Sequence, residues 1–117
     1  MRVPVDSIIK RAEEIFSEFG GTINCEEENW EDHFTLWEAR LIKNGEVPVE
    51  HYCGEMEIGF YDLLTAMCLS NGYALMEYAM DQVFDSPGLD IYVLSFVLKD
   101  INSDELYYSL NNIHEFC

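Results

Sequence analysis

The sequence predicts an α+β fold: an N-terminal helix, a small antiparallel β-sheet, and then a C-terminal group of three to four helices. Three patterns lead to this prediction. Apolar residues recur at helical spacing in the first 20 residues, an Asn44-Gly45 pair separates two strand-like segments, and helical spacing returns after residue 60. The length of 117 residues fits a single globular domain, 1–117, and 49% hydrophobic residues suffice for a buried core.

The first element is predicted as an amphipathic helix over residues 5–19. Asp6 or Ser7 can cap the free N–H groups of its first turn, and Gly20-Gly21 ends it with a residue that accepts positive φ. Its apolar residues follow the spacing of one buried helix face: Ile8, Ile9, Ala12, Ile15, Phe16 and Phe19.

A sheet is predicted next. Residues 22–32 form an acidic connector or an edge strand, and residues 34–42 ("FTLWEARLI") are rich in aromatic and branched side chains, which favour a strand. Asn44-Gly45 then indicates a type I′ hairpin turn before the strand-like "EVPVEHYC". Because Pro48 has no N–H to donate, this second strand is expected at a sheet edge, and residues 21–25 are a candidate third strand.

The C-terminal half is predicted to be helical. Residues 60–70 and 73–84 show helical spacing on either side of an Asn71-Gly72 break. Residues 86–88 (Ser-Pro-Gly) indicate a turn. Residues 89–101 fit either a helix or a strand; their branched residues favour a strand, but we expect a helix because the neighbouring segments are predicted to be helical. A final helix is expected over residues 103–116, capped by Ser103.

The charge is the most unusual property of the chain. There are 23 Asp and Glu residues against 6 Lys and Arg, so the formal net charge is -17. No Lys or Arg occurs between Ala12 and Ala39 or between Asn44 and Leu98, and each stretch holds nine carboxylates. Most acids therefore lack an intramolecular cation. Such a surface attracts cations and basic proteins, and it repels nucleic acid and anionic membranes.

Several chemical functions are disfavoured. The four cysteines, Cys25, Cys53, Cys68 and Cys117, lack the close pairs of a zinc site and are expected to be thiols in a reducing compartment. The cluster Cys25, Glu28, Asp32 and His33 offers possible ligands, but its spacing matches no metal motif. His51 and Cys53, two apart on a strand, are too distant for a nucleophile and its base. We expect no enzyme activity, metal or cofactor.

Unpaired carboxylates are therefore the candidate site residues. Carboxylates two apart on a strand or four apart on a helix repeat at roughly 6–7 Å, which approximates the spacing of phosphates along a nucleic-acid strand. The candidate rows are Glu13/Glu14/Glu18, Glu26/Glu27/Glu28/Glu31/Asp32, Glu50/Glu55/Glu57 and Glu77/Asp81/Asp85, the last expected on one helix face. Trp30, Trp37 and exposed tyrosines are candidate anchors for a partner.

Four stretches carry a resemblance to a widespread family of small phage and prophage proteins: "WEARLIKNGE", "HYCGEMEI", "DLLTAMCLS" and "MDQVFDSPGLDIYVL". The likeness covers about residues 34–110, and "VFDSPGLD" departs from the family's Gly-Tyr-Asp pattern. The resemblance implies a mobile-element origin. In size and charge the chain is also similar to anti-CRISPR and anti-restriction inhibitors, several of which imitate DNA.

These observations predict a non-enzymatic inhibitor. It would bind the basic nucleic-acid-binding surface of a CRISPR effector or restriction enzyme and block DNA binding by nucleic-acid mimicry. The alternative is an immunity protein that covers the basic active site of a nuclease toxin. We expect a cytoplasmic location in a bacterial host, since "MRVPVDSIIK" does not resemble a signal peptide. No direct contact with nucleic acid or membrane is expected, and the oligomeric state stays open.

Overall fold

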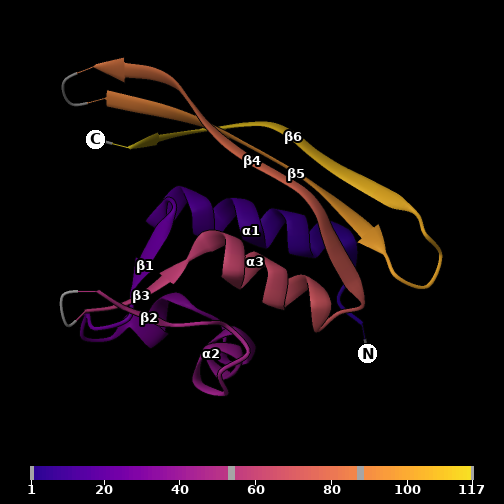
Figure 1. The fold of residues 1–117 in the computed structure, drawn as a ribbon, viewed down its shortest axis with the longest axis horizontal. Coiled ribbons are helices and arrows are strands. Elements are labelled where there is room, and N and C mark those ends of the chain that lie inside the picture. The colour runs from indigo at the N-terminus through magenta and orange to yellow at the C-terminus, as the bar shows by residue number, and fades with distance from the viewer. Residues whose placement is uncertain (1, 53–54, 87–88, 117) are drawn as a thin grey trace.

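The fold consists of two three-stranded antiparallel sheets with helices between and beside them. The computed structural model describes residues 2–52, 55–86 and 89–116, with side chains described over residues 2–49, 56–82 and 92–109. Within this part of the chain, a long C-terminal sheet lies over helices α1 and α3, and a small sheet and helix α2 lie beyond them (Figure 1).

Helix α1 spans Val5–Phe19, which confirms the first predicted element. Its buried residues are those of the predicted apolar face, and Phe16 is fully buried. Gly20 ends the helix with a φ of 71°, a conformation that glycine adopts without steric cost. The predicted caps are wrong, however: the N-cap residue is Pro4, and no side chain caps the first turn.

Helix α2 (Leu36–Lys43) replaces the strand predicted over residues 34–42. Thr35 and Glu38 form a capping box, in which Thr35 Oγ1 accepts from the Glu38 N–H (3.2 Å) and Glu38 Oε2 accepts from the Thr35 N–H (3.1 Å). This T-x-x-E pair starts a helix because it satisfies two N–H groups that have no partner inside the helix. The local cap therefore overrides the strand preference of the aromatic and branched residues.

The predicted hairpin turn at Asn44-Gly45 is also wrong, because this pair ends helix α2. Asn44 is the C-cap, and Gly45 follows with a φ of 76°. The Glu46 N–H donates to the Leu41 carbonyl (3.1 Å) and the Gly45 N–H to the Ile42 carbonyl (3.2 Å). These two bonds form a Schellman motif, which needs a left-handed residue at the same position as a type I′ turn does.

The small sheet contains β1 (Thr22–Asn24), β2 (Glu50–Tyr52) and β3 (Glu55–Gly59) in the order β1–β3–β2. The candidate third strand near residues 21–25 is thus present as β1, but it pairs with β3 and not with residues 34–42. Strand β2 lies at the edge of the sheet, as Pro48 suggested, although Pro48 itself precedes the strand. A turn and a 3-10 helix, η1 (Trp30–His33), connect β1 to α2.

Helix α3 spans Phe60–Leu69, which confirms the helix predicted over residues 60–70. The Asn71-Gly72 break is also confirmed, since Gly72 has a φ of 80° in the turn after the helix.

The predicted C-terminal group of helices is wrong. Residues 73–84, 89–101 and 103–116 lie instead in strands β4 (Tyr73–Ser86), β5 (Leu89–Asp100) and β6 (Leu106–Phe116). The strands pair in chain order as an antiparallel sheet. Ser103 lies in the turn between β5 and β6, where it caps no helix. The Ser-Pro-Gly turn falls partly on residues 87–88, which lie outside the described residues.

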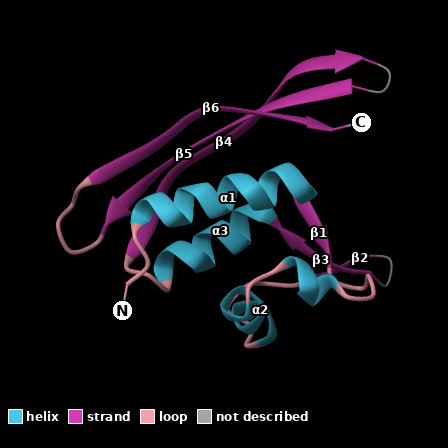
Figure 2. Cartoon of the chain, turned by 180° about the vertical axis from the view of Figure 1, so that it is seen from behind, coloured by secondary structure: helices cyan, strands magenta, loops and turns pink. Residues whose placement is uncertain are grey.

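The core forms where this sheet covers α1 and α3 (Figure 2). Phe16 of α1 contacts Phe60 of α3 edge to face, with ring centroids 5.2 Å apart, and Phe60 in turn meets Tyr78 of β4 at 6.2 Å. Leu94 and Phe96 of β5 are also buried against this cluster. One face of the β4–β6 sheet is thus directed to the helices, so residues that alternate with Tyr78 and Phe96 point to the other face.

Candidate functional site

The turn after β1 carries three consecutive exposed carboxylates. Glu26, Glu27 and Glu28 are all exposed, and the Glu26 N–H is held by Asn24 Oδ1 at 2.9 Å. Asp32 of η1 is exposed as well. Among the described residues, no Lys, Arg or His lies within ion-pair distance of these four carboxylates.

Trp30, which was predicted as a partner anchor, is only partly exposed. It packs against the core, with its ring 6.0 Å from that of Phe34 in an edge-to-face arrangement. This packing fixes η1 to the molecule, and Glu31 and Asp32, which follow Trp30 in η1, face solvent. The role of Trp30 as a partner anchor stays a prediction.

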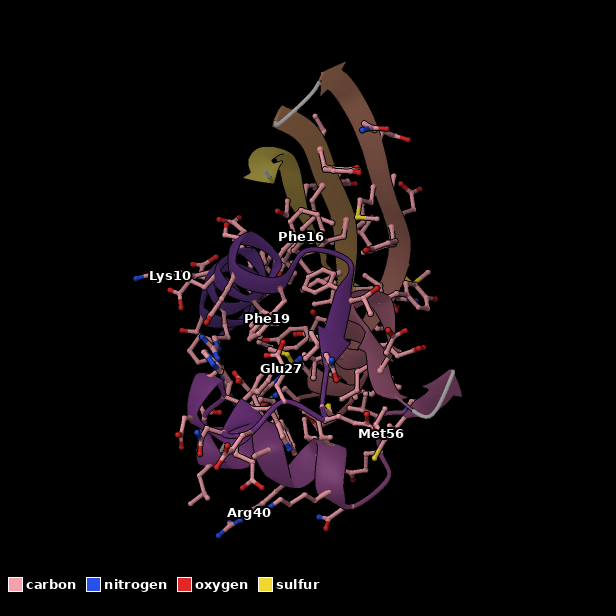
Figure 3. The ribbon with its side chains drawn as sticks, turned by 90° about the vertical axis from the view of Figure 1, so that its left-hand side faces the viewer. Lys10, Phe16, Phe19, Glu27, Arg40 and Met56 are labelled. Atoms are coloured by element: carbon pink, nitrogen blue, oxygen red, sulfur yellow. The ribbon has the colours of Figure 1, made fainter. Side chains whose placement is uncertain are left out.

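Two of the predicted acidic rows meet at the C-terminal half of α1. Glu18 contacts His33 of η1, with Oε1 2.6 Å from Nδ1, and the His33 ring also packs edge to face on Phe19 at 5.5 Å. Glu14 is exposed on the same helix and lies 3.4 Å from Arg11. Figure 3 shows Glu27 just below this end of α1.

We define the acidic face as the exposed carboxylates of the C-terminal half of α1, of the turn after β1 and of η1, joined through the Glu18–His33 contact. Its members are Glu14, Glu18, Glu26, Glu27, Glu28, Glu31 and Asp32. Glu13, the remaining member of the α1 row, is half-buried, and its carboxylate accepts from the Ser109 hydroxyl of β6 at 3.4 Å. Glu13 therefore contributes to packing between α1 and the long sheet.

The predicted row Glu77/Asp81/Asp85 does not lie on a helix. These residues belong to β4, where Glu77 and Asp81 alternate with Tyr78 and are exposed on the sheet face that points away from the helices. The side chain of Asp85 lies outside the described residues, as do those of Glu50 and Glu55. Glu77 and Asp81 thus form a separate acidic patch on a different face of the molecule.

Most of the cations are already engaged in ion pairs. Arg2 pairs with Asp100 (2.9 Å), Lys43 with Glu31 (2.8 Å) and Lys99 with Asp104 (3.0 Å). Lys10 and Arg40 are exposed and form no ion pair with a described carboxylate. The acidic face keeps a strong negative charge even after Arg11, Lys43 and His33 are counted against it.

Arg11 makes the most buried ion pair. Its Nε and Nη2 donate to the two oxygens of Glu38 at 2.6 and 2.8 Å, and Glu38 is only 1% exposed. The hydrogen bond to Glu38 raises the pKa of the Arg11 guanidinium above its ordinary value. Arg11 Nη2 also donates to the His33 carbonyl at 3.0 Å. The pair therefore connects α1, η1 and α2 beneath the acidic face.

Cys25 and Cys68 are both buried thiols. Burial raises the pKa of the Cys25 thiol to about 11 and that of Cys68 to about 12, so both are protonated and poorly nucleophilic at neutral pH. Where side chains are described, no group of three His, Cys, Asp or Glu residues is arranged to hold a metal ion.

Comparison with protein-family models, curated proteins and solved structures finds no match. None of the described helices is both long and apolar enough to cross a membrane.

Two features of the site were not predicted from the sequence: the Arg11–Glu38 pair and a small pocket beside Trp37. The pocket has a volume of ≈ 230 Å³ and lies between α1, α2 and α3. The T-x-x-E spacing of Thr35 and Glu38 was the available signal for the cap. Nothing in the sequence signals that Arg11, 27 residues away, completes it.

Proposed function

We propose that this protein is a non-enzymatic inhibitor that binds the basic nucleic-acid-binding surface of another protein through its acidic face. In the form that the phage resemblance suggests, the partner is a CRISPR effector or restriction enzyme, and the inhibitor blocks its access to DNA. One observation carries the proposal: Glu26, Glu27, Glu28 and Asp32 face solvent together without a described cation near them.

The clustering of these carboxylates carries an electrostatic cost. Carboxylates clustered without counter-charges repel one another, and a net charge of -17 exceeds the magnitude of roughly 2–8 that solubility requires in a small domain. A basic partner relieves this repulsion on binding. The same charge accelerates encounter with a positive cleft and makes association dependent on salt.

The fold supports presentation of the acidic face as a defined surface. Trp30 packs on the core under η1, and the Arg11–Glu38 pair fixes η1 to α1 and α2 through the His33 carbonyl. The backbone that carries the carboxylates is thus held by buried contacts, which lowers the ordering cost of binding.

The first experiment identifies the partner. A tagged full-length chain is incubated with lysates of bacteria that carry CRISPR and restriction systems, and bound proteins are identified by mass spectrometry at low and high NaCl. We expect recovery of a basic nucleic-acid-binding complex that is released as salt rises and competes with DNA. Recovery of a nuclease toxin would support the immunity function in place of this proposal. Binding that does not depend on salt would contradict nucleic-acid mimicry.

Two triple variants of equal net charge then test the surface. Glu26→Gln/Glu27→Gln/Glu28→Gln removes three charges from the acidic face, whereas Glu46→Gln/Glu77→Gln/Asp81→Asn removes three exposed charges elsewhere. At roughly 0.5 kcal/mol for each exposed charge, the first variant should bind the recovered partner about tenfold more weakly. The second should change affinity by less than about threefold. Equal losses would show that total charge, not the acidic face, drives binding.

A further inference from the structure

A small apolar pocket opens beside the acidic face. It has a volume of ≈ 230 Å³, and apolar walls come from Val3, Ile8, Met67 and Trp37. Two of these walls are firmly placed, because Ile8 and Met67 are each only 2% exposed. Trp37 differs from them: it is 37% exposed, so its indole forms a wall that solvent reaches.

The charged groups of the pocket neutralise each other. Arg11 and Glu38 both line it, and their two hydrogen bonds of 2.6 and 2.8 Å occupy both carboxylate oxygens. The second oxygen of Glu38 also accepts from the Thr35 N–H. A charged group that entered the pocket would therefore lose its hydration without finding a free counter-charge. The group that fits inside is uncharged and apolar.

The volume limits the size of the occupant. Pockets for whole small-molecule ligands are roughly 300–1,000 Å³, so this pocket is too small for most of them. It matches instead a single large apolar side chain. At protein interfaces, side chains of this kind contribute most of the binding energy when they fill such pockets.

The charged groups next to the pocket indicate the charge of the partner segment that carries this side chain. Arg11 connects the pocket to the acidic face directly, since its Nη1 lies 3.4 Å from Glu14 and its Nη2 donates to the His33 carbonyl. A segment whose apolar side chain enters the pocket thus places its neighbouring residues near Glu14, at the edge of the acidic face. Lys or Arg at those positions would be attracted, and Asp or Glu would be repelled.

We infer that the Trp37 pocket is the anchor site of the partner: it receives one aromatic or large aliphatic side chain from a segment that is otherwise basic. The inference rests on the proposed function for the nature of the partner and adds where and how specificity arises. The acidic face provides steering, and the pocket selects among basic surfaces those that present an apolar side chain at the right place.

Short peptides test this inference without knowledge of the partner. The probes are Ac-KKFKK-NH₂, Ac-KKAKK-NH₂ and Ac-SSFSS-NH₂, titrated into the ¹⁵N-labelled full-length chain at low salt and followed by NMR. We expect the phenylalanine peptide to bind at least about tenfold more tightly than the alanine peptide and to shift the Trp37 indole N–H signal. We expect the alanine peptide to shift only amides of the acidic face, and the serine peptide to bind more weakly than either.

Variants locate the effect. Trp37→Ala removes one wall, and Ser7→Phe fills the pocket from an exposed position that also lines it. In both variants the advantage of phenylalanine over alanine should fall below about twofold. Tyr108→Ala is the matched control, because it truncates an aromatic side chain that is 59% exposed on the long sheet, and it should keep the full advantage. Thermal unfolding checks that each variant is folded.

The outcomes separate this inference from the proposed function. If the phenylalanine and alanine peptides bind equally, or if the advantage survives in Ser7→Phe, the pocket is not an anchor site, and the acidic-face proposal still stands. If Ac-SSFSS-NH₂ binds as tightly as Ac-KKFKK-NH₂, the inference that the partner segment is basic is wrong. Failure of the Glu26–Glu28 triple variant to weaken lysine peptides would count against the acidic face itself.

Discussion

The Arg11–Glu38 ion pair is the residue-scale contact on which the site depends most. Glu38 is almost completely buried and relies on Arg11 and the Thr35 N–H for its hydrogen bonds. Arg11→Met removes the guanidinium and leaves a buried carboxylate without a counter-charge. We expect the free energy of unfolding to fall by about 3 kcal/mol, at the lower end for such pairs because Arg11 is partly exposed, as measured by urea denaturation.

Two control variants test whether the loss of stability in Arg11→Met comes from the Arg11–Glu38 pair. Lys10→Met removes the neighbouring cation, which is exposed and forms no ion pair with a described carboxylate, and should change stability by less than about 0.5 kcal/mol. The double variant Arg11→Met/Glu38→Leu removes both charges and should recover much of the loss. If Arg11→Met were no more damaging than Lys10→Met, the pair would not hold α1 to α2.

At the scale of elements, Arg2 ties the ends of three elements together. It donates from Nε to the Asn71 carbonyl after α3, stacks over the Tyr73 ring at the start of β4, and pairs with Asp100 at the end of β5. The hydrogen bond from Arg2 holds the pKa of Asp100 below its ordinary value, and backbone N–H groups of Asn102 and Ser103 add to the effect.

This shift predicts an acid-dependent contribution to stability. Because the pKa of Asp100 is lower in the folded chain, the pair stabilises the fold above the unfolded-state pKa of about 4 and loses this effect as pH falls through the folded-state value. Arg2→Met should therefore lower the melting temperature more at pH 7 than at acid pH, where Asp100 becomes protonated and only the contacts of Arg2 with Asn71 and Tyr73 remain, as followed by circular dichroism. The exposed pair Lys99–Asp104 supplies the control Lys99→Met, and an Arg2→Met effect independent of pH would contradict the assignment.

Two misassigned elements show where local sequence signals compete. In residues 34–46, the strand preference of aromatic and branched residues opposed signals for both ends of a helix. The Thr35–Glu38 capping box starts the helix, and Gly45 ends it. The caps prevailed because they satisfy N–H and carbonyl groups that no other part of the chain reaches. Asn44-Gly45 was ambiguous in principle, since a Schellman motif and a type I′ turn both require positive φ at glycine.

The whole molecule is dominated by self-repulsion among its carboxylates. A net charge of -17 spread over a chain with a Cα radius of gyration of 14.6 Å favours expansion, and among the described acids only a minority form an ion pair. Raising NaCl from about 10 mM to about 0.5 M shortens the screening length from roughly 30 Å to well under 10 Å. We expect the free energy of unfolding to rise by about 1–2 kcal/mol, measured by urea denaturation.

The sign of this salt effect distinguishes two contributions, because salt weakens the repulsion between carboxylates but also weakens the attraction within ion pairs. If the pairs of Arg2, Arg11, Lys43 and Lys99 dominated, added salt would weaken them and stability would fall. The Glu26–Glu28 triple variant should show a smaller gain with salt than the native chain. An equal gain would mean that the repulsion lies elsewhere on the surface.

The sequence by itself determined the properties that depend on nearby residues. Helices α1 and α3 followed from the spacing of apolar residues, the Asn71-Gly72 break from its turn chemistry, and the exposure of Glu26, Glu27 and Glu28 from their charge. The signal for each of these features lies within a short stretch of the chain, so that stretch is enough to predict it.

Only the tertiary structure decided the C-terminal half and the composition of the site. Residues 73–116 carry apolar side chains at spacings that suit a helix or a strand, and hydrogen-bonded pairing between β4, β5 and β6 settles the choice. The same is true of Trp30, which packs inward, and of Trp37, which borders a pocket with Arg11 and Glu38. Contacts between residues far apart in the sequence determine whether each tryptophan ring is packed inward or exposed, and a local sequence pattern does not predict these contacts.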